Sequence, residues 1–173
     1  MHPPDPRLEA RRATEREPHR AIGWILLSDA ELDAGDAQAG RTAAERALAL
    51  SPGHPEALAR LGRAHWMQGD LPAAANQLRA AARNAPQHPG IAVWLGHVLE
   101  DVGEAEAASE AYARAHALDP REPLVAAYLL AWRRRLCDWR DLDTLSLQVR
   151  GAVQRAQASV EHPTLRRIPA RRV

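Results

Sequence analysis

Small and apolar residues recur with a period of 34 along residues 21–122, and this pattern organises the chain. Leucines, alanines, glycines and prolines all share the period. A common period of this length in several residue classes is typical of an array of helical repeats. The recurring positions include Leu27, Leu61, Leu95 and Leu129; Ala47, Ala81 and Ala115; Gly35, Gly69 and Gly103; and Pro52, Pro86 and Pro120.

Each unit of the pattern predicts two helices joined by a glycine turn. In the first unit, small and apolar residues recur at i, i+3 and i+4 spacing over residues 21–34, which favours a helix. Gly35 ends that helix, because glycine tolerates the left-handed conformation of a helix end. A second helix over residues 37–50 ends before Pro52, since proline cannot continue a helix and restricts the residue before it.

Three such units follow one another over residues 21–54, 55–88 and 89–122. A single helix pair cannot bury its apolar face, so neighbouring units must stack. The sequence therefore predicts an all-α fold, a right-handed solenoid of helix-turn-helix repeats. Small residues are expected to let the paired helices approach closely, at Ser28, Gly62 and Gly96.

The ends of the chain depart from the repeat. Residues 1–20 predict an irregular segment and a short helix, over residues 7–17, that caps the array with half a unit. Residues 123–157 predict a longer, degenerate terminal helix pair, in which Cys137 takes the place of the turn glycine. The proline- and arginine-rich residues 158–173 predict a disordered tail.

In its packing positions, this unit resembles the tetratricopeptide repeat. The second and third units match that pattern at nearly every position, and the first departs at Glu31, Gly40 and Ala44. In this family the first helix of each unit lines a concave groove, so the resemblance implies a groove that binds a protein or peptide. Aromatic side chains interleaved with charges suit such a ligand, although two tryptophans in core positions and a solvated charged face are the alternative. The groove residues given by the alignment are Asp29, Asp33, Arg60, Arg63, Trp66, Met67, Trp94, His97, Glu100, Asp101 and Tyr128.

The charge is balanced overall but not along the chain. The sequence has 23 basic and 22 acidic residues, with 7 Arg against 13 acids in residues 21–120 and 11 Arg against 5 acids in residues 121–173. The overall balance gives no argument for nucleic-acid binding, so local patches matter more. No apolar leader is visible, no apolar run reaches the ~20 residues that span a membrane, and a lone cysteine fits a reducing compartment. We therefore expect a soluble cytoplasmic protein without membrane contact.

No catalytic or cofactor motif stands out, so we expect no enzyme activity, no cofactor and no metal. The chain has no glycine-rich phosphate loop, no HExxH and no paired cysteines, and its histidines lack ligand spacing. Cys137 is expected to be a buried thiol between the last helices rather than a nucleophile. The three arginines 133–135 are expected to form salt bridges with Asp138, Asp141 and Asp143 rather than to contact phosphate or nucleic acid.

The segment 132–150 (WRRRLCDWRDLDTLSLQVR) supports a closer resemblance. It is similar to the junction between the repeats and the catalytic region in bacterial O-linked N-acetylglucosamine transferases, and the array segments 53–66 and 88–108 are similar as well. In that family the catalytic residues lie in two following domains, which the short remainder after residue 153 cannot hold. The resemblance implies a truncated or frame-shifted, non-catalytic arm for substrate recognition, with a dedicated protein-binding scaffold as the other interpretation. The asparagine ladder of the animal enzyme is replaced here by Leu26, Arg60, Trp94 and Tyr128.

Self-association through the C-terminal helices is a third possibility. If no catalytic domains cover the terminal helix pair, we expect it to expose an apolar face, and such a face tends to find a partner. The face consists of Leu136, Trp139, Leu142 and Leu145.

Overall fold

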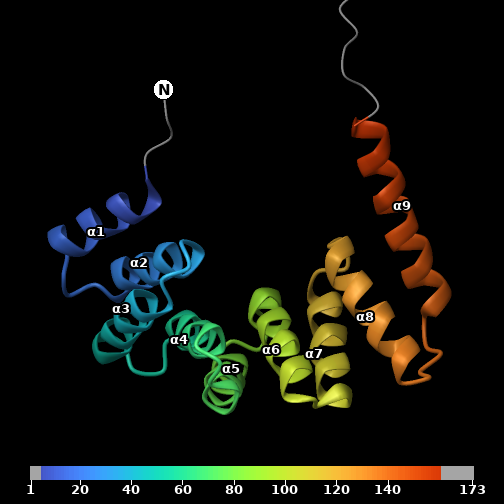
Figure 1. The fold of residues 1–173 in the computed structure, drawn as a ribbon, viewed down its shortest axis with the longest axis horizontal. Coiled ribbons are helices and arrows are strands. Elements are labelled where there is room, and N and C mark those ends of the chain that lie inside the picture. Colours follow the sequence, from blue (N-terminus) through green and yellow to red (C-terminus); the bar gives the residue numbers. More distant parts are fainter. Residues whose placement is uncertain (1–4, 161–173) are drawn as a thin grey trace, which may run out of the picture.

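The computed structural model describes residues 5–160, and the side chains of residues 5–157, as an all-α chain. The helices form an arch whose two ends rise on the same side (Figure 1). The predicted fold class is confirmed. The helices within the described residues are α1 (Pro6–Arg16), α2 (Ala21–Asp33), α3 (Ala37–Leu50), α4 (Pro55–Met67), α5 (Leu71–Asn84), α6 (Pro89–Val102), α7 (Ala105–Leu118), α8 (Pro123–Arg135) and α9 (Leu142–Val160).

The helices begin and end near the prolines and glycines that the sequence marks as helix limits. Proline occupies the first turn of α4, α6 and α8, where its missing N–H removes no helical hydrogen bond. The turn glycines Gly35, Gly69 and Gly103 adopt φ values of 87°, 80° and 88°, which lie in the left-handed region. The acid after the glycine caps the next helix in two units: Asp36 accepts from the Ala39 amide at 2.9 Å and Asp70 from the Ala73 amide at 3.2 Å.

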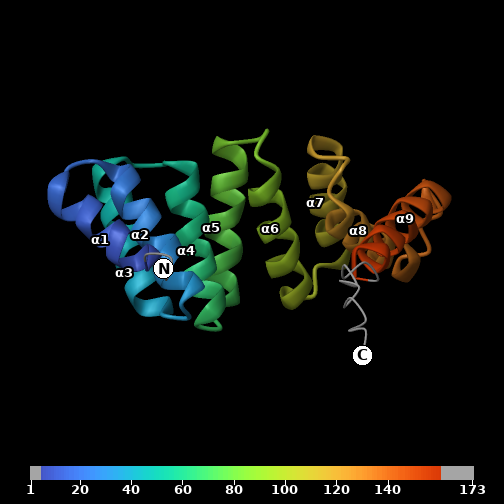
Figure 2. The ribbon, with the colours of Figure 1, turned by 90° about the horizontal axis from the view of Figure 1, so that it is seen from above.

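Consecutive helices pack against one another, and the first helices of neighbouring units also touch, α2 against α4 and α4 against α6. Figure 1 shows α2 and α4 on the inner side of the arch with α3 and α5 on its outer side, and α7 between α6 and α8. Seen from above in Figure 2, α4 to α9 follow one another along the long axis in chain order, with α1, α2 and α3 overlapping at one end. The inner side is therefore built from first helices, which carry the predicted groove residues.

The small residues allow the close helix contacts that the sequence predicts. A Cβ atom added at Gly62 would lie 2.7 Å from Leu78 Cγ, and one at Gly96 would lie 2.6 Å from Tyr112 Cε1. In the first unit, the buried Ser28 hydroxyl donates to the Gly40 carbonyl at 2.7 Å. A larger residue at either glycine would displace the core side chain that faces it.

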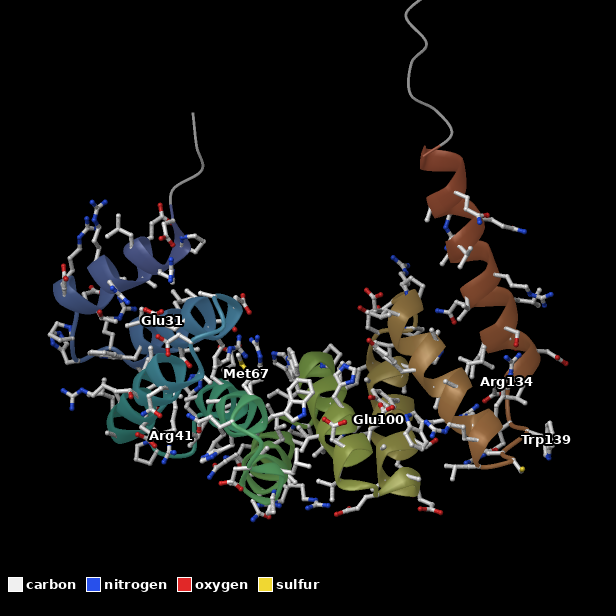
Figure 3. All side chains as sticks on the ribbon, in the orientation of Figure 1. Glu31, Arg41, Met67, Glu100, Arg134 and Trp139 are labelled. Atoms are coloured by element: carbon white, nitrogen blue, oxygen red, sulfur yellow. The ribbon has the colours of Figure 1, made fainter. Side chains whose placement is uncertain are left out.

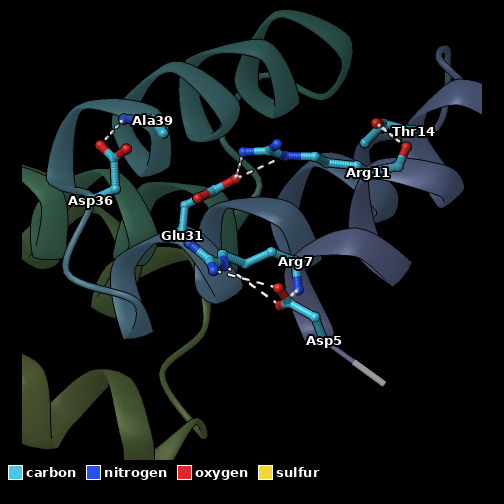
Figure 4. Close-up of polar contacts among 7 residues, drawn as sticks. All are labelled: Asp5, Arg7, Arg11, Thr14, Glu31, Asp36 and Ala39. Atoms are coloured by element: carbon cyan, nitrogen blue, oxygen red, sulfur yellow. Dashed lines mark hydrogen bonds and ion pairs between the residues drawn. The ribbon is translucent and has the colours of Figure 1, made fainter. Parts of the chain in front are cut away.

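The capping helix α1 packs on α2 and explains the departure of the first unit at Glu31. The Glu31 side chain is only 4 % exposed and accepts from Arg11 Nη2 at 2.6 Å and from Arg11 Nε at 3.1 Å (Figure 4). A buried carboxylate requires such a partner, because burying an isolated charge is costly. Glu31 therefore joins the cap to the array.

The terminal pair α8 and α9 follows the array, and α9 continues to Val160, past residue 157, where the sequence predicts the pair to end. Residues 161–173 of the predicted tail lie outside the described residues. The α8–α9 turn is held by Arg133, whose side chain is 10 % exposed. Arg133 Nη1 donates to the Arg140 carbonyl at 2.6 Å and to Asp141 Oδ2 at 3.1 Å, and Arg133 Nε lies 3.8 Å from Asp138 Oδ2.

The salt bridges predicted for the three arginines are confirmed for Arg133 but not for its neighbours. Arg134 donates to the Ser146 hydroxyl at 3.2 Å, and the Arg135 guanidinium lies over the Trp132 ring at 4.6 Å. Arg133 thus holds the α8–α9 turn through buried polar contacts, which we call the Arg133 clamp, while Arg134 makes a hydroxyl contact and Arg135 a cation–π contact. The reason is helical geometry, which points three consecutive side chains in three directions.

Two predictions for the terminal pair were wrong. Cys137 is exposed rather than buried, because it takes the place of the turn glycine, with φ 53°. The proposed apolar face is not exposed as a unit either: Leu145 is 2 % exposed in the core between α8 and α9, and Leu142 packs against the same core. Leu136 is half-buried, and only Trp139, at 76 %, is largely open to solvent.

Candidate functional site

The predicted groove residues lie on α2, α4, α6 and α8, along the inner side of the arch, which we call the concave face. All of them except Met67 belong to one connected set of ion pairs, hydrogen bonds and ring contacts. Met67 is 41 % exposed and lies on the inner side of α4 (Figure 3). The structure therefore brings together most of the set that the alignment selected.

The first part of the network is ionic and joins α2 to α4. Asp29 Oδ1 lies 2.7 Å from Arg60 Nε and 2.9 Å from Arg63 Nη1, and Asp33 Oδ1 lies 2.8 Å from Arg63 Nη2. The arginine side chains are mostly buried, 20 % exposed for Arg60 and 13 % for Arg63. Asp33, at 66 %, is largely open to solvent.

Arg63 also connects this ionic part to the aromatic part. Its guanidinium carbon lies 4.5 Å from the centroid of the Trp94 ring on α6. A guanidinium over an indole face is stabilised by a cation–π contact. One side chain on α4 therefore contacts both α2 and α6, and fixes three consecutive first helices relative to one another.

The second part is a contiguous group of rings, which we call the aromatic cluster: Trp66, Trp94, His97, Tyr112 and Tyr128. Trp66 meets Trp94 edge-on with centroids 5.6 Å apart and lies parallel to His97 at 6.2 Å. His97 meets Tyr128 edge-on at 4.8 Å, and Tyr128 stacks on Tyr112 at 5.2 Å. These arrangements are the ones that ring quadrupoles favour. The cluster thus spans α4, α6, α7 and α8.

Carboxylates at the end of α6 hold the cluster in place. Trp66 Nε1 donates to Asp101 Oδ2 at 2.6 Å, and the Tyr112 hydroxyl donates to Glu100 Oε2 at 3.0 Å. Burial, and then the hydrogen bond to Glu100, raise the pKa of the Tyr112 hydroxyl. Tyr112 therefore keeps its proton and directs it at Glu100.

This hydrogen bond also assigns the proton of His97. The Tyr112 hydroxyl lies 2.8 Å from His97 Nδ1, and its single proton is already directed at Glu100. His97 Nδ1 must therefore carry a proton and donate it to the tyrosine oxygen. Burial lowers the pKa of the imidazole, so the neutral ring is favoured and Nε2 is left with a free lone pair. Within residues 5–157, Nε2 has no hydrogen-bond partner, and the His97 side chain is partly exposed.

Tyr112 is the functional residue that the sequence alignment missed. It comes from α7, a second helix, and is therefore not among the residues that the alignment selected from the first helices. The structure shows it fully buried, yet its hydroxyl contacts two residues of the concave face. Its place in the period is shared by Ala44 and Leu78, so a polar aromatic at a position otherwise apolar was the available indication.

Other kinds of site find no support in the part of the chain that the structure describes. No group of three or more His, Cys, Asp or Glu residues within it could hold a metal ion. No helix among residues 5–160 is long and apolar enough to cross a membrane.

Comparisons with known proteins identify the repeat. The family model described as tetratricopeptide repeat matches residues 7–55, 25–89 and 59–123, which together cover more than half of the chain. No curated protein matches the sequence significantly. The closer resemblance to O-linked N-acetylglucosamine transferases is not shown by these comparisons.

Solved structures show the same fold at low sequence identity. The thermophilic tetratricopeptide protein TTC0263 of Thermus thermophilus superposes with a TM-score of 0.72 at 19 % identity, over 90 % of this chain and 84 % of that one. PilF of Pseudomonas aeruginosa gives 0.72 at 17 % identity, over 83 % and 66 %. MamA of Desulfovibrio magneticus RS-1 gives 0.67 at 21 % identity, over 88 % and 84 %.

Proposed function

This chain belongs to the tetratricopeptide repeat family, and on that premise we propose that it is a protein-interaction scaffold. Its ligand is a protein or peptide bound on the concave face of α2, α4, α6 and α8. The chain contributes recognition and no catalysis of its own.

The observation that carries the proposal is the aromatic cluster with its supporting contacts. Trp66, Trp94 and Tyr128 are each partly exposed on the concave face. Aromatic side chains supply most of the binding energy at many interfaces, because they bury a large area at little cost in rotamer entropy. Here the rings are already fixed by Arg63, Asp101 and by one another. A surface that is ordered before binding loses less entropy when the partner arrives.

The polar groups around the cluster favour a ligand that donates hydrogen bonds. His97 Nε2 offers a lone pair, and the exposed Asp101 offers carboxylate oxygens that are only partly used by Trp66. An extended peptide presents backbone N–H groups at regular spacing and is such a donor. The rings would then bind the apolar side chains of the same peptide.

A random peptide library displayed on phage tests the proposal. The folded chain is immobilised, and peptides that it enriches are measured for affinity by calorimetry. We expect Trp66→Ala to weaken those peptides by at least about tenfold, the loss typical of an interface anchor. Asp101→Asn keeps the cluster but removes a charge, and we expect a smaller loss. Arg41→Ala on the outer helix α3, where Glu45 is the ion-pair partner of Arg41 within the described residues, is the control.

The outcome against the proposal is equally defined. Enriched peptides that bind Trp66→Ala and the wild type equally, with both proteins folded by circular dichroism, would show that the concave face is not the binding surface. Failure to enrich any peptide would contradict peptide binding itself.

A second function, the substrate-selecting arm of an O-linked N-acetylglucosamine transferase, is favoured by the sequence of segment 132–150. That segment forms the end of α8, the turn clamped by Arg133 and the start of α9. Added to the separately produced catalytic part of such an enzyme, this chain should change which acceptor peptides are modified. An unchanged acceptor profile would contradict this function, and turnover of a nucleotide sugar by this chain alone would contradict the proposal of a non-catalytic scaffold.

A further inference from the structure

A hollow of about 350 Å³ lies between the capping helix α1 and α2. It adjoins the N-terminal end of the concave face, because two of its lining residues, Asp29 and Asp33, belong to the ionic network described above. Its volume is at the lower end of the range for ligand sites. The residues that line it are Pro6, Glu9, Ala10, Ala13, Leu26, Asp29, Ala30 and Asp33.

The lining has an apolar floor and an acidic rim. Three alanines and a proline give the floor little bulk, and Leu26 is 53 % exposed beside them. The rim carries the carboxylates of Glu9, Asp29 and Asp33. A surface of this composition is complementary to a side chain with a long aliphatic stem and a cationic head.

The chain neutralises this rim only in part. Two arginines of the neighbouring helix α1 have other partners: Arg7 pairs with Asp5 and Arg11 with Glu31 (Figure 4). Arg63 pairs with both aspartates and Arg60 with Asp29, through side chains that are 13 % and 20 % exposed. Asp33 remains 66 % exposed, and Glu9 makes no ion pair within the described residues.

The Asp33 carboxylate is only partly used by the fold. Asp33 is the last residue of α2, where a carboxylate is disfavoured by the helix dipole. Its Oδ1 pairs with Arg63, which Asp29 also contacts. Because the Asp33 side chain is 66 % exposed, its carboxylate is also open to a cationic ligand.

We propose that the α1–α2 hollow is a subsite of the concave face that binds an arginine or lysine side chain of the partner peptide. The aliphatic stem lies on Ala10, Ala30 and Leu26, and the cationic head contacts Asp33 and Glu9. This subsite deepens the proposed scaffold function and rests on it. The ligand therefore has an apolar part for the aromatic cluster and a basic residue at the end nearest α1.

The peptides enriched from the phage library test this subsite. We expect them to carry Arg or Lys at one fixed distance from their apolar residues. The double variant Glu9→Gln with Asp33→Asn should weaken them by about three- to tenfold, the loss expected for two solvent-exposed ion pairs, while the variant stays folded by circular dichroism. The control double variant, Glu45→Gln with Glu110→Gln, makes the same change in net charge on second helices, at exposed positions outside the hollow.

A charge exchange separates direct contact from a long-range field. Asp33→Lys should reject the basic peptide and accept the same peptide with Glu at the basic position. Enriched peptides without a basic preference, or equal loss in the test and control variants, would overturn the subsite while leaving concave-face binding intact. If Trp66→Ala also binds the enriched peptides like the wild type, concave-face binding itself is contradicted. If Trp66→Ala weakens them and the Glu9/Asp33 double variant does not, only the subsite is contradicted.

Discussion

The turns of the repeat units and the turn between α8 and α9 share one backbone arrangement but stabilise it in different ways. In the second unit, the Gly69 amide donates to the Trp66 carbonyl at 3.0 Å and the Asp70 amide to the His65 carbonyl at 2.9 Å. One period after the third unit, the Cys137 amide donates to the Arg134 carbonyl at 3.3 Å and the Asp138 amide to the Arg133 carbonyl at 2.8 Å. Both turns end a helix with the same pair of hydrogen bonds.

The difference lies in what makes the left-handed residue acceptable. Gly69 adopts the left-handed conformation without steric cost, because it lacks a Cβ atom. Cys137 has one, and a second residue of the same turn, Asp141, also has positive φ, 50°. The Arg133 clamp on Asp138, Asp141 and the Arg140 carbonyl supplies the bonds that hold this strained turn. The comparison shows that the 34-residue period specifies where the backbone turns with positive φ. Glycine usually occupies that position, and side-chain contacts such as those of Arg133 can stabilise the turn when another residue occupies it.

Removing the clamp should have the largest effect. We expect Arg133→Ala to destabilise the α8–α9 pair by about 2–3 kcal/mol, because a mostly buried charged group loses its hydrogen bonds and its packed stem together. Hydrogen exchange of the α9 amides measures this loss locally, which matters because a repeat array need not unfold in one step. Arg134→Ala, which loses only an exposed contact to Ser146, is the control. Equal protection in both variants would show that the turn is not held by Arg133.

Adding a side chain to a repeat turn should have the next effect. Nothing lies within 4 Å of a Cβ atom added at Gly69, so Gly69→Ala tests the backbone conformation alone. We expect a destabilisation of about 1–2 kcal/mol, the cost of a left-handed conformation for a residue with a Cβ atom. Urea unfolding of the variant measures it. A neutral substitution would mean that the turn can adopt another conformation.

The reverse change at the terminal turn should be stabilising but smaller. Cys137→Gly relieves the same conformational cost, and the exposed thiol has little packing to lose. Because glycine also has the higher entropy in the unfolded chain, we expect a net gain of about 0.5–1 kcal/mol. Urea unfolding measures both variants under the same conditions. Gly69→Ala adds a Cβ atom at the left-handed position of one turn, and Cys137→Gly removes it at the equivalent position of the other. A destabilised Cys137→Gly would show that the thiol contributes to the turn.

The smallest effect should depend on pH. Hydrogen bonds from the Arg140 side chain, and then from its backbone amide, lower the pKa of the Asp138 carboxyl to about 2 from its ordinary 3.8. A lowered carboxyl pKa stabilises the fold above the ordinary value, and the stabilisation is lost as pH falls through the folded value. We therefore expect the melting-temperature difference between the wild type and Asp138→Asn to be constant above about pH 5 and to shrink towards pH 2. A difference that stays constant over this range would contradict the role of the charge.

Most of the fold was predictable because each helix limit is marked locally. Glycine with φ near 80° and proline in the first helical turn are properties of single residues, so the period placed the helices of residues 21–122 correctly. The contacts that hold the α8–α9 turn were not predictable in this way. They depend on the side chain of Arg133 reaching the Arg140 carbonyl and Asp141 across the turn, which no pattern in the sequence describes.

The candidate site was predictable as a set of residues but not as a network. The period placed Asp29 and Arg63 on the same face one unit apart, and their ion pair follows from that register. It did not show that Tyr112, from a second helix, assigns the proton of His97. The hollow beside α1 was missed as well, because the packing angle of a capping helix depends on tertiary contacts such as Arg11 with Glu31.

Arg63 lies between two kinds of contact along the inner side of the arch, ionic on the side of α2 and aromatic on the side of α6. Between the first and second units the inner contacts are ion pairs, one of them with the exposed Asp33, and salt at physiological strength screens exposed charges over ~8 Å. Between the second, third and terminal units the inner contacts include edge-on and stacked ring pairs, which salt does not weaken. The curvature between the first and second units should therefore relax as ionic strength rises, while the rest of the arch keeps its shape.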